Sequence, residues 1–380
     1  FDEIFSYVKK NKARKKIAVL VSGDPGLYSF LGRISDNLKK DEYIVIPGIS
    51  SLQVAFSKIG ELWQDAEIVS IHGRPIEALV EKVKNSKKVF LLADKNFPPD
   101  KIAACLLRNG IKNRRAIVFE NLSYPDERVI DTDLKKLSRM RDFGLCAMVI
   151  KEDRPFDSQR SLRVEKGKLY GIGIGPGDPK LITLKALEIL EKADTIFVPK
   201  ASGEGESLAR SIIGESVPKK KIIELIFPMT KDKLILKLYW KKAAFKIAGE
   251  IKKEKLVAFI TIGDPMIYST YIYLLKTLNA YFPSIKSEAV PGISAFNAAA
   301  SRAGIPLVEG NEKMAIVPVT KGLFGVEESF RKFDRVVLMK VGSKLAEVVE
   351  LLKKNNLLKN SILVSRAGHP DEKIVYNISS

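Results

Sequence analysis

The sequence predicts an α/β protein with largely parallel sheets, built as a tandem duplication. Two observations carry this expectation. Short runs rich in Val and Ile alternate with longer amphipathic stretches along the chain, which is typical of α/β domains. The motif G-D-P-x-(Leu/Ile)-Tyr-Ser also occurs twice, in "VSGDPGLYS" (21–29) and in "TIGDPMIYS" (261–269).

The apolar runs predict strands and the amphipathic runs predict helices. Strands are expected at 16–22, 42–48, 87–93, 115–120, 144–150, 169–175, 194–199, 255–263 and 335–341. Helices are expected at 75–85, 98–110, 178–193 and 344–356. Gly110 ends the second of these helices, in the position where glycine commonly follows a helix.

Further matches occur in the same order as the G-D-P motifs. The stretch "VIPGISSLQVAFSKIG" (45–60) matches "AVPGISAFNAAASRAG" (289–304), and "YPDERVI" (124–130) matches "HPDEKIV" (369–375). The run "VFLLAD" (89–94) resembles "VVLMKV" (336–341). The offset drifts only from 240 (Asp24 to Asp264) to 245 (Pro125 to Pro370), which indicates a duplication with small insertions.

The alignment predicts a first domain at 1–151, a polar linker at 152–167 and a second domain at 168–380. The second domain has more than 80 residues before its G-D-P motif, whereas the first has only 22. We therefore expect the first domain to lack its N-terminal portion. The run "GLCAMVI" (144–150) has no match after "HPDEKIV", so we expect the second domain to lack its closing strand and the chain to be a fragment.

Composition limits the function classes. A chain of 380 residues exceeds what one core usually organises, and 46% apolar residues suffice for two packed domains. The net charge of +19 favours an anionic partner, although a lysine-rich solubilising surface gives the same balance. Cys105 and Cys146 lie among apolar residues, so we expect buried thiols, a reducing, cytoplasmic location and no metal site. No uncharged run is long enough to span a membrane.

Three glycine-containing loops follow predicted strands, where ligands bind in open α/β sheets. The first, Gly173-Ile174-Gly175-Pro176-Gly177-Asp178, is not a dinucleotide fingerprint, because Pro176 has no N–H to offer a pyrophosphate. The second is the G-D-P motif in both copies. The third is the Pro-Gly-Ile-Ser motif, whose Ser50 and Ser294 are either helix N-caps or ligand contacts.

These three blocks, in this order, resemble the tetrapyrrole methylase family, which uses S-adenosyl-L-methionine. The second domain resembles its precorrin-2 (cobalt-factor II) C20-methyltransferase branch, through residues 198–212, 227–233, 257–274 and 291–318. The first domain resembles the C5-methyltransferase part of the C5,15 enzyme, through residues 20–29, 46–74 and 120–129.

The resemblance implies bilobal domains with the cofactor in the cleft between lobes. It implies a multi-carboxylate tetrapyrrole substrate, with or without cobalt, which agrees with the basic balance. The cofactor residues implied in the second domain are Pro176, Gly177, Gly263, Asp264, Ile267, Ser294 and Ala295. Those implied in the first domain are Gly23, Asp24, Leu27, Ser50 and Ser51.

His72 and Arg74, in "HGR", are the candidate catalytic residues. A histidine titrates near neutral pH and can handle a proton, and an arginine can clamp a substrate carboxylate. The alternative is a surface-loop histidine and a solvated arginine. Methyl transfer from an activated sulfonium needs placement more than a strong base, so we expect positioning residues and not a catalytic triad.

The resemblance implies a bifunctional methyltransferase of cobalamin biosynthesis. The second domain would methylate C20 of precorrin-2 or cobalt-factor II, and the first would methylate C5 of a precorrin-6B or cobalt-precorrin-7 type intermediate. We expect a homodimer or an intramolecular pseudo-dimer, with no nucleic acid and no membrane partner. Two alternatives stay open: a ribosomal RNA methyltransferase of the same superfamily, and a first domain that is only a scaffold.

Overall fold

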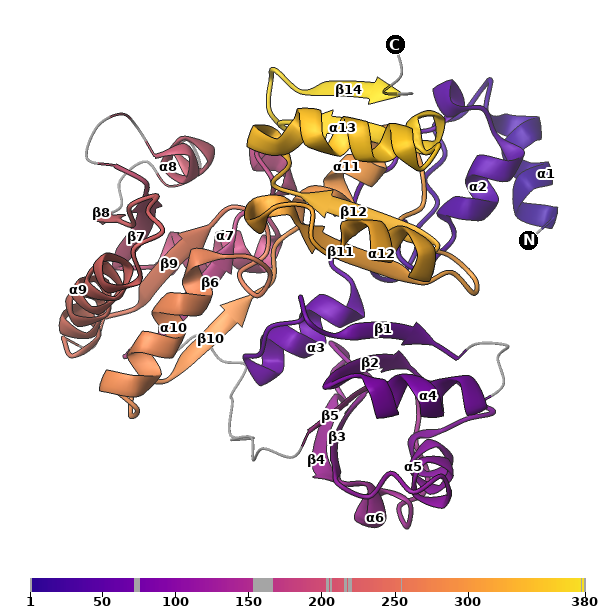
Figure 1. Ribbon diagram of the computed structural model, residues 1–380, viewed down its shortest axis with the longest axis horizontal. Helices are drawn as coiled ribbons and strands as arrows, with labels where there is room; N and C mark the ends of the chain where they lie inside the picture. The colour runs from indigo at the N-terminus through magenta and orange to yellow at the C-terminus, as the bar shows by residue number, and fades with distance from the viewer. Residues whose placement is uncertain are drawn as a thin grey trace.

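The computed structural model describes residues 2–71, 76–152, 167–202, 205, 207–214, 217, 221–253, 255–376 and 378. We call residues 1–151 the first repeat and residues 168–380 the second repeat. Figure 1 shows the large sheet of each repeat on a different side of the molecule, with the C-terminal elements above them. The α/β class predicted from the sequence is confirmed.

The first repeat begins with two helices and a third that enters the centre of the molecule. These are α1 (Asp2–Asn11), α2 (Leu31–Asn37) and α3 (Ser51–Ile59). A five-stranded sheet of order β1-β2-β5-β3-β4 follows. Its strands are β1 (Glu67–Ser70), β2 (Lys88–Leu92), β3 (Arg114–Glu120), β4 (Arg128–Asp133) and β5 (Cys146–Glu152). Its helices are α4 (Glu77–Asn85), α5 (Pro99–Arg108) and α6 (Leu134–Leu137).

The second repeat opens with a parallel sheet of order β10-β6-β9-β7-β8. Its strands are β6 (Leu169–Gly173), β7 (Thr195–Lys200), β8 (Lys221–Ile226), β9 (Val257–Thr261) and β10 (Ser287–Val290). The helices are α7 (Leu184–Lys192), α8 (Leu208–Ile213), α9 (Lys233–Ile251), α10 (Thr270–Tyr281) and α11 (Ala295–Ala303). Because all five strands run the same way, their carboxyl ends form one edge.

The chain ends in two small sheets. Strands β11 (Met314–Pro318) and β12 (Arg335–Met339) pair in parallel, and β13 (Ile362–Ser365) and β14 (Lys373–Tyr376) pair in antiparallel fashion. Helices α12 (Val326–Lys332) and α13 (Leu345–Lys354) accompany them. In the first repeat, β2 and β3 are the counterparts of β12 and β13. There β5 lies between β2 and β3 and joins them into one sheet. Among the described residues no strand joins β12 to β13.

Matching positions of the two repeats adopt the same local backbone. Gly23 and Gly263 have φ of 78° and 73°, and Gly60 and Gly304, which end α3 and α11, both have φ of 64°. Tyr28 and Tyr268 also share a positive φ, of 50° and 47°, although they are not glycines. A left-handed tyrosine is uncommon, so its occurrence at both positions shows that the G-D-P loop is one conserved piece of geometry within this chain.

The predicted strands at 16–22 and 42–48 are wrong. Both segments are free of regular secondary structure apart from Glu42, which ends a single 3-10 turn. Their counterparts β9 and β10 lie on either side of β6, and no described strand of the first repeat takes the place of β6. Without that partner the apolar side chains face solvent: Leu20 is 92% and Ile46 is 74% exposed.

The predicted helix at 178–193 is divided. A 3-10 turn covers Pro179–Leu181, and α7 begins only at Leu184. Thr183 interrupts the helix because its hydroxyl accepts a hydrogen bond from the N–H of Ala186, which makes it an N-cap. The amphipathic pattern was detected correctly, but it does not show the cap within it.

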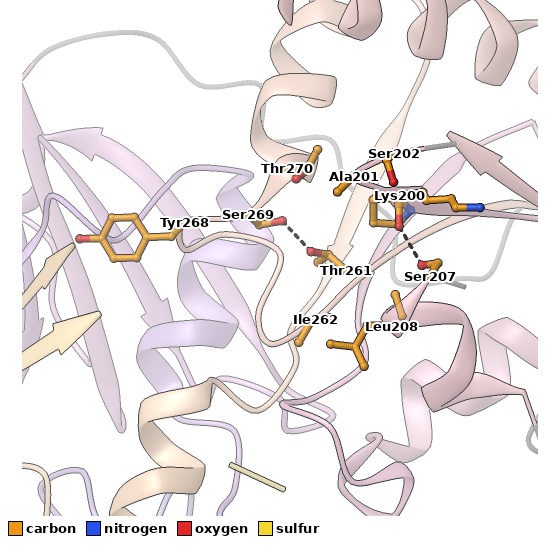
Figure 2. A pocket seen from close by; sticks show the side chains of 12 residues that line it. Lys200, Ala201, Ser202, Ser207, Leu208, Thr261, Ile262, Tyr268, Ser269 and Thr270 are labelled. Atoms are coloured by element: carbon orange, nitrogen blue, oxygen red, sulfur yellow. Dashed lines mark hydrogen bonds between the residues drawn. The ribbon is translucent and has the colours of Figure 1, made fainter. Parts of the chain in front are cut away.

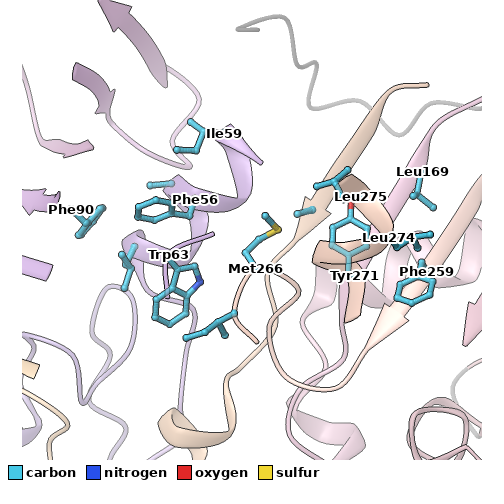
Figure 3. Close-up of a cluster of buried hydrophobic side chains, with 14 of the residues drawn as sticks. Phe56, Ile59, Trp63, Phe90, Leu169, Phe259, Met266, Tyr271, Leu274 and Leu275 are labelled. Atoms are coloured by element: carbon cyan, nitrogen blue, oxygen red, sulfur yellow. The ribbon is translucent and has the colours of Figure 1, made fainter. Parts of the chain in front are cut away.

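One hydrophobic cluster crosses the boundary between the repeats. Figure 3 shows Phe56 and Trp63 of the first repeat on one side of Met266, and Tyr271 and Leu275 of the second repeat on the other. The ring of Trp63 packs edge-on against Phe296, with centroids 5.9 Å apart. Each large sheet also has a cluster of its own. The two repeats therefore share a core.

The predicted free thiols are confirmed: Cys105 and Cys146 are both buried, and burial raises the pKa of Cys146 to about 12. The predicted linker at 152–167 lies outside the described residues except for its two ends. Within the described part of the chain, none of the helices has the length and apolar character that a bilayer crossing requires.

Candidate active site

Three glycine loops of the second repeat meet at the carboxyl ends of β6, β9 and β10. The N–H of Gly263 donates to the carbonyl of Gly175 at 2.7 Å. A Cβ on Gly173 would lie 2.4 Å from the oxygen of Gly263, and one on Gly292 would lie 2.3 Å from the same oxygen. These glycines are therefore required for the loops to pack against one another, a reason that the sequence alone did not indicate.

Asp264 ties two of these loops together. Its carboxylate accepts hydrogen bonds from the N–H of Met266 at 2.9 Å and from the N–H of Gly292 at 3.3 Å. The side chain is only 2% exposed. Burial raises the pKa of Asp264 to about 6, because the desolvation of the charged form outweighs its hydrogen bonds.

Asp24 does the same in the first repeat. It accepts hydrogen bonds from the N–H of Gly26 at 2.9 Å and from the N–H of Gly48 at 3.0 Å. Burial raises its pKa, while these two bonds and one from Asn297 lower it. The matching contacts extend the repeat from sequence to hydrogen bonding.

The two Pro-Gly-Ile-Ser serines behave differently. Ser50 is an N-cap, since its hydroxyl accepts from the N–H of Gln53 at 3.3 Å. Ser294 makes no such cap, and its hydroxyl lies 3.4 Å from the side-chain nitrogen of Gln53. Ser51 and Ala295 are the first residues of α3 and α11 and are half-buried.

The other predicted cofactor residues are mostly engaged in packing. Pro176 and Gly177 are buried, and the imidazole of His369 lies against Gly177, where a Cβ would approach it within 2.4 Å. Ile267 belongs to the shared core. Leu27 forms a bridge with Val308 of the second repeat. Their contact with a cofactor stays a prediction.

A cavity of about 450 Å³ opens beside this junction, at the carboxyl ends of β7 and β9. Figure 2 shows hydroxyl-bearing side chains and apolar ones facing the same space. Its lining consists of Pro199, Lys200, Ala201, Ser202, Ser207, Leu208, Ala209, Thr261, Ile262, Tyr268, Ser269 and Thr270.

Hydrogen bonds fix the polar part of the lining. The hydroxyl of Ser269 donates to that of Thr261 at 3.0 Å, and the hydroxyl of Ser207 donates to the carbonyl of Pro199 at 2.8 Å, both visible in Figure 2. Lys200 pairs with Glu224 at 2.9 Å. The cavity lining therefore combines hydroxyl groups of fixed orientation with a lysine whose charge is balanced by Glu224.

None of the predicted cofactor residues lines this cavity, but several lining residues are their direct neighbours in the sequence. Thr261 and Ile262 directly precede Gly263, and Tyr268 directly follows Ile267. The ring of Tyr268 points away from the hydroxyl groups in Figure 2, and its own hydroxyl donates to the carbonyl of Ile316 at 3.0 Å. Tyr268 is thus held in place as a wall.

Sequence reasoning missed the β7 side of the cavity. Lys200 and Ser207 fall in "VPKASGEGESLARSI" (198–212), which carried the family resemblance without any role being assigned to its side chains. The signal was the position of this stretch after a predicted strand. His72 and Arg74 lie outside the described residues, so their catalytic role stays a prediction. Among the described residues, no group of three or more His, Cys, Asp or Glu could hold a metal ion.

Known proteins resemble the chain in sequence. It is 45% identical over 208 residues to a "Probable cobalt-precorrin-2 C(20)-methyltransferase" of Methanocaldococcus jannaschii, covering 55% of this chain and 86% of that protein. It is 36% identical over 149 residues to a "Probable cobalt-precorrin-7 C(5)-methyltransferase" of the same organism, covering 38% and 68%.

Among solved structures, a uroporphyrin-III C-methyltransferase of Thermus thermophilus, complexed with S-adenosylhomocysteine, superimposes with a TM-score of 0.39 at 23% identity. That match covers 55% of this chain and 82% of the other. The sequence pattern of the Tetrapyrrole (Corrin/Porphyrin) Methylases matches residues 2–138 and 168–379, which is most of the chain. The chain therefore belongs to the tetrapyrrole methylase family.

Proposed function

We propose that the second repeat transfers a methyl group from S-adenosyl-L-methionine to C20 of precorrin-2 or its cobalt form, in cobalamin biosynthesis. The cavity between β7 and β9 is the single observation that carries the proposal. Its volume of about 450 Å³ lies within the range of small-molecule sites. It stands at the carboxyl edge of a parallel sheet, where ligands bind in this class of fold.

The lining fits the cofactor. Ile262 and Leu208 offer apolar surface, while Thr261, Ser202 and Ser269 carry hydroxyl groups that can donate and accept hydrogen bonds. A sulfonium nucleoside needs both kinds of contact. The Gly263-Asp264 loop directly follows this lining, and Gly175, which precedes Pro176-Gly177, accepts a hydrogen bond from Gly263; the backbone of these loops would hold the remainder of the molecule.

The cofactor supplies an activated methyl group when bound. The residues of the chain supply placement, since proximity and orientation account for much of the barrier reduction in such a transfer. The three-loop junction is closely packed, because a Cβ on Gly173 or Gly292 would lie within 2.4 Å of the carbonyl oxygen of Gly263. The wall of the cavity therefore stays fixed while the substrate carbon is aligned.

The proposal also includes the expected activity of the first repeat, the charge of the substrate, the location and the assembly of the protein. The first repeat would carry C5-methyltransferase chemistry, with His72 and Arg74 at its substrate. The net charge of +19 suits a substrate with many carboxylates. We place the protein in the cytoplasm, with domain bounds at 1–151 and 168–380, as a homodimer or intramolecular pseudo-dimer that needs no nucleic acid.

The first prediction concerns the product. Incubation with methyl-labelled S-adenosyl-L-methionine and precorrin-2, or its cobalt form, should place the label at C20, as located by mass spectrometry and NMR. The preference between the two forms identifies the route. Absence of label with both substrates, despite normal cofactor binding, contradicts the C20 assignment and directs the search to later corrinoid intermediates and then to RNA.

A matched pair of variants connects that activity to the cavity. Ala201 is exposed on the lining, so Ala201→Phe should fold normally and fill the space, with the labelling rate reduced at least about tenfold by steric exclusion. Ala13 is also exposed and follows α1 by two residues, and Figure 1 shows α1 on the opposite side of the molecule from β7 and β9. Ala13→Phe should label like the wild type. Equal rates for both variants would remove the cavity from the reaction.

A second candidate concerns the first repeat alone. Its segments at 16–22 and 42–48 do not form a sheet, which favours a scaffold over a second catalytic site. Cofactor stoichiometry decides between these functions: equilibrium dialysis should give two sites per chain if both repeats bind and one site if the first repeat is a scaffold.

A further inference from the structure

The buried aspartate of each repeat is held partly by the other repeat. The side-chain nitrogen of Gln53, on α3, donates to the carboxylate of Asp264 at 3.1 Å, and the indole N–H of Trp63 donates to the same group at 3.3 Å. In the opposite direction, the side chain of Asn297 on α11 faces Asp24 and lowers the pKa of that carboxyl, which burial raises. Gln53 and Asn297 occupy matching positions in the two Pro-Gly-Ile-Ser helices. We call these bonds the exchanged contacts.

The amide of Gln53 is completely engaged. Its oxygen accepts from the N–H of Ser50 at 3.1 Å, as part of the capping box of α3. Its nitrogen donates to the carbonyl of Gly292 at 2.8 Å as well as to Asp264. Because Ser50 fixes which end of the amide faces inward, the nitrogen is directed at the second repeat. Gln53 is 1% exposed, so water cannot replace these bonds.

The contact reaches the loop that borders the cavity. Asp264 ties the loop of residues 263–266 to the Pro-Gly-Ile-Ser loop, and the same stretch continues into Tyr268 and Ser269 of the cavity wall. The first repeat also holds Tyr268 itself, since the N–H of Tyr268 donates to the side-chain oxygen of Gln64 at 3.1 Å. Within the described part of the chain, the second repeat thus supplies backbone N–H donors to Asp264, whereas the side-chain donors come from the first repeat.

We infer that Gln53 and Trp63 of the first repeat are positioning residues for the cofactor loop of the second repeat, so that the second site is incomplete without the first repeat. This rests on the proposed cofactor site. It gives the first repeat a role that is independent of any activity of its own.

The test compares two variants of α3 in the full chain. Gln53→Met keeps the length of the side chain and removes its donor. Ser57→Ala is the matched control, because Ser57 also donates across the repeats, to the carbonyl of Ala289, without touching Asp264. Removing a hydrogen bond to a charged group should weaken binding of S-adenosylhomocysteine about tenfold in Gln53→Met. Ser57→Ala should bind like the wild type in isothermal titration calorimetry.

A double-mutant cycle separates positioning from a general loss of structure. In an Asp264→Asn background, Gln53→Met should cost less than about twofold in affinity, because its effect acts through the carboxylate. Trp63→Phe, which removes one donor and keeps an aromatic ring, is the milder second variant and should shift affinity in the same direction. Equal losses in Gln53→Met and Ser57→Ala, or an unchanged Gln53→Met, overturn the inference.

Hydrogen exchange tests the positioning role of Gln53 separately from the proposed function. Peptides covering 262–270 should exchange faster in Gln53→Met than in Ser57→Ala, with or without a ligand. If the wild type binds no S-adenosylhomocysteine, the proposed function fails, and the exchange result alone decides whether Gln53 holds the loop. Equal exchange in the two variants refutes the positioning role.

Discussion

Asp264 is a buried carboxylate held by uncharged donors. Four groups contact it: the N–H groups of Met266 and Gly292, the amide of Gln53 and the indole of Trp63. None of them carries a formal charge. Burial therefore dominates and raises the pKa of Asp264 to about 6, above the value near 4 of an exposed aspartate. The acid gains protons more readily in the folded protein than in the unfolded chain.

This shift has a consequence for stability that can be measured. Between about pH 4 and pH 6 the folded state binds more protons at Asp264 than the unfolded state, so the contribution of this group to stability falls as pH rises through that window. Above pH 6 the cost of the buried charge is fully present. Asp264→Asn removes the titration. The difference in free energy of unfolding between this variant and the wild type should therefore move in favour of the variant from pH 4 to pH 6, and stay constant above pH 7.

Urea unfolding at half-unit intervals of pH tests this prediction, with Asp133→Asn as the control. Asp133 is half-exposed, and its pKa is lowered by the hydrogen bond that it accepts from the N–H of Lys136, so its titration acts with the opposite sign. A pH-independent difference for Asp264→Asn would contradict the raised pKa.

Sequence reasoning identified Asp264 but not the residues that hold it. The repeated G-D-P motif made the aspartate visible, whereas Gln53 reads as an ordinary helix residue. Its partner lies 211 positions away, and no local pattern reports a contact of that range. Trp63 was missed for the same reason. The residues around Asp264 that remained hidden are the two that reach it from the other repeat.

At the scale of elements, most of the strands and helices that were predicted from apolar and amphipathic runs end within two residues of the observed ones. The predicted strand at 87–93 is β2, and the predicted helix at 98–110 is α5. The failures at 16–22 and 42–48 have one cause. A segment becomes a strand only when a neighbouring strand pairs with it. The apolar pattern of a segment indicates that it tends to pair, but it does not indicate whether a partner strand is present.

Leu20 and Ile260 occupy matching positions in opposite surroundings, since Leu20 is 92% exposed and Ile260 is fully buried in β9. Leu20→Ser should change the free energy of unfolding by no more than about 0.5 kcal/mol, as expected for a surface position. Ile260→Ser should lower it by at least about 3 kcal/mol, through a cavity and a buried hydroxyl.

Chemical denaturation of the two variants under identical conditions makes the comparison direct. Both positions stand four residues before the aspartate of their G-D-P motif, so the comparison isolates mainly the difference in burial. A loss for Leu20→Ser as large as that for Ile260→Ser would show that the segment at 16–22 is packed when the protein folds in solution.

For the whole molecule, the shared core matters most. Leu52, Phe56 and Trp63 of the first repeat belong to the same cluster as Phe259, Tyr271 and Phe296 of the second. Burial of apolar side chains is the main favourable term in folding, so a cluster that spans both repeats links their stabilities. The duplication behaves as one folding unit at its centre, even though each large sheet keeps its own cluster.

Phe296→Ala tests this coupling. The ring packs against Trp63 from the opposite repeat, and its removal should lower the free energy of unfolding by about 3 to 5 kcal/mol. Hydrogen exchange should show reduced protection in β1–β5 as well as in β6–β10. Loss of protection confined to the second repeat would mean that the two halves unfold separately.

The exchanged contacts also limit how the gene can evolve. Each half supplies the amide that stabilises the other half's aspartate, Gln53 for Asp264 and Asn297 for Asp24. A recombination that paired either half with an unrelated neighbour would leave the buried carboxylate of that half short of a side-chain donor, at a cost of about 1 to 3 kcal/mol. Selection therefore acts on the halves jointly, and a substitution at Gln53 is expected to favour a compensating one at Asp264, so that the two codons change together in descendants of the fused gene.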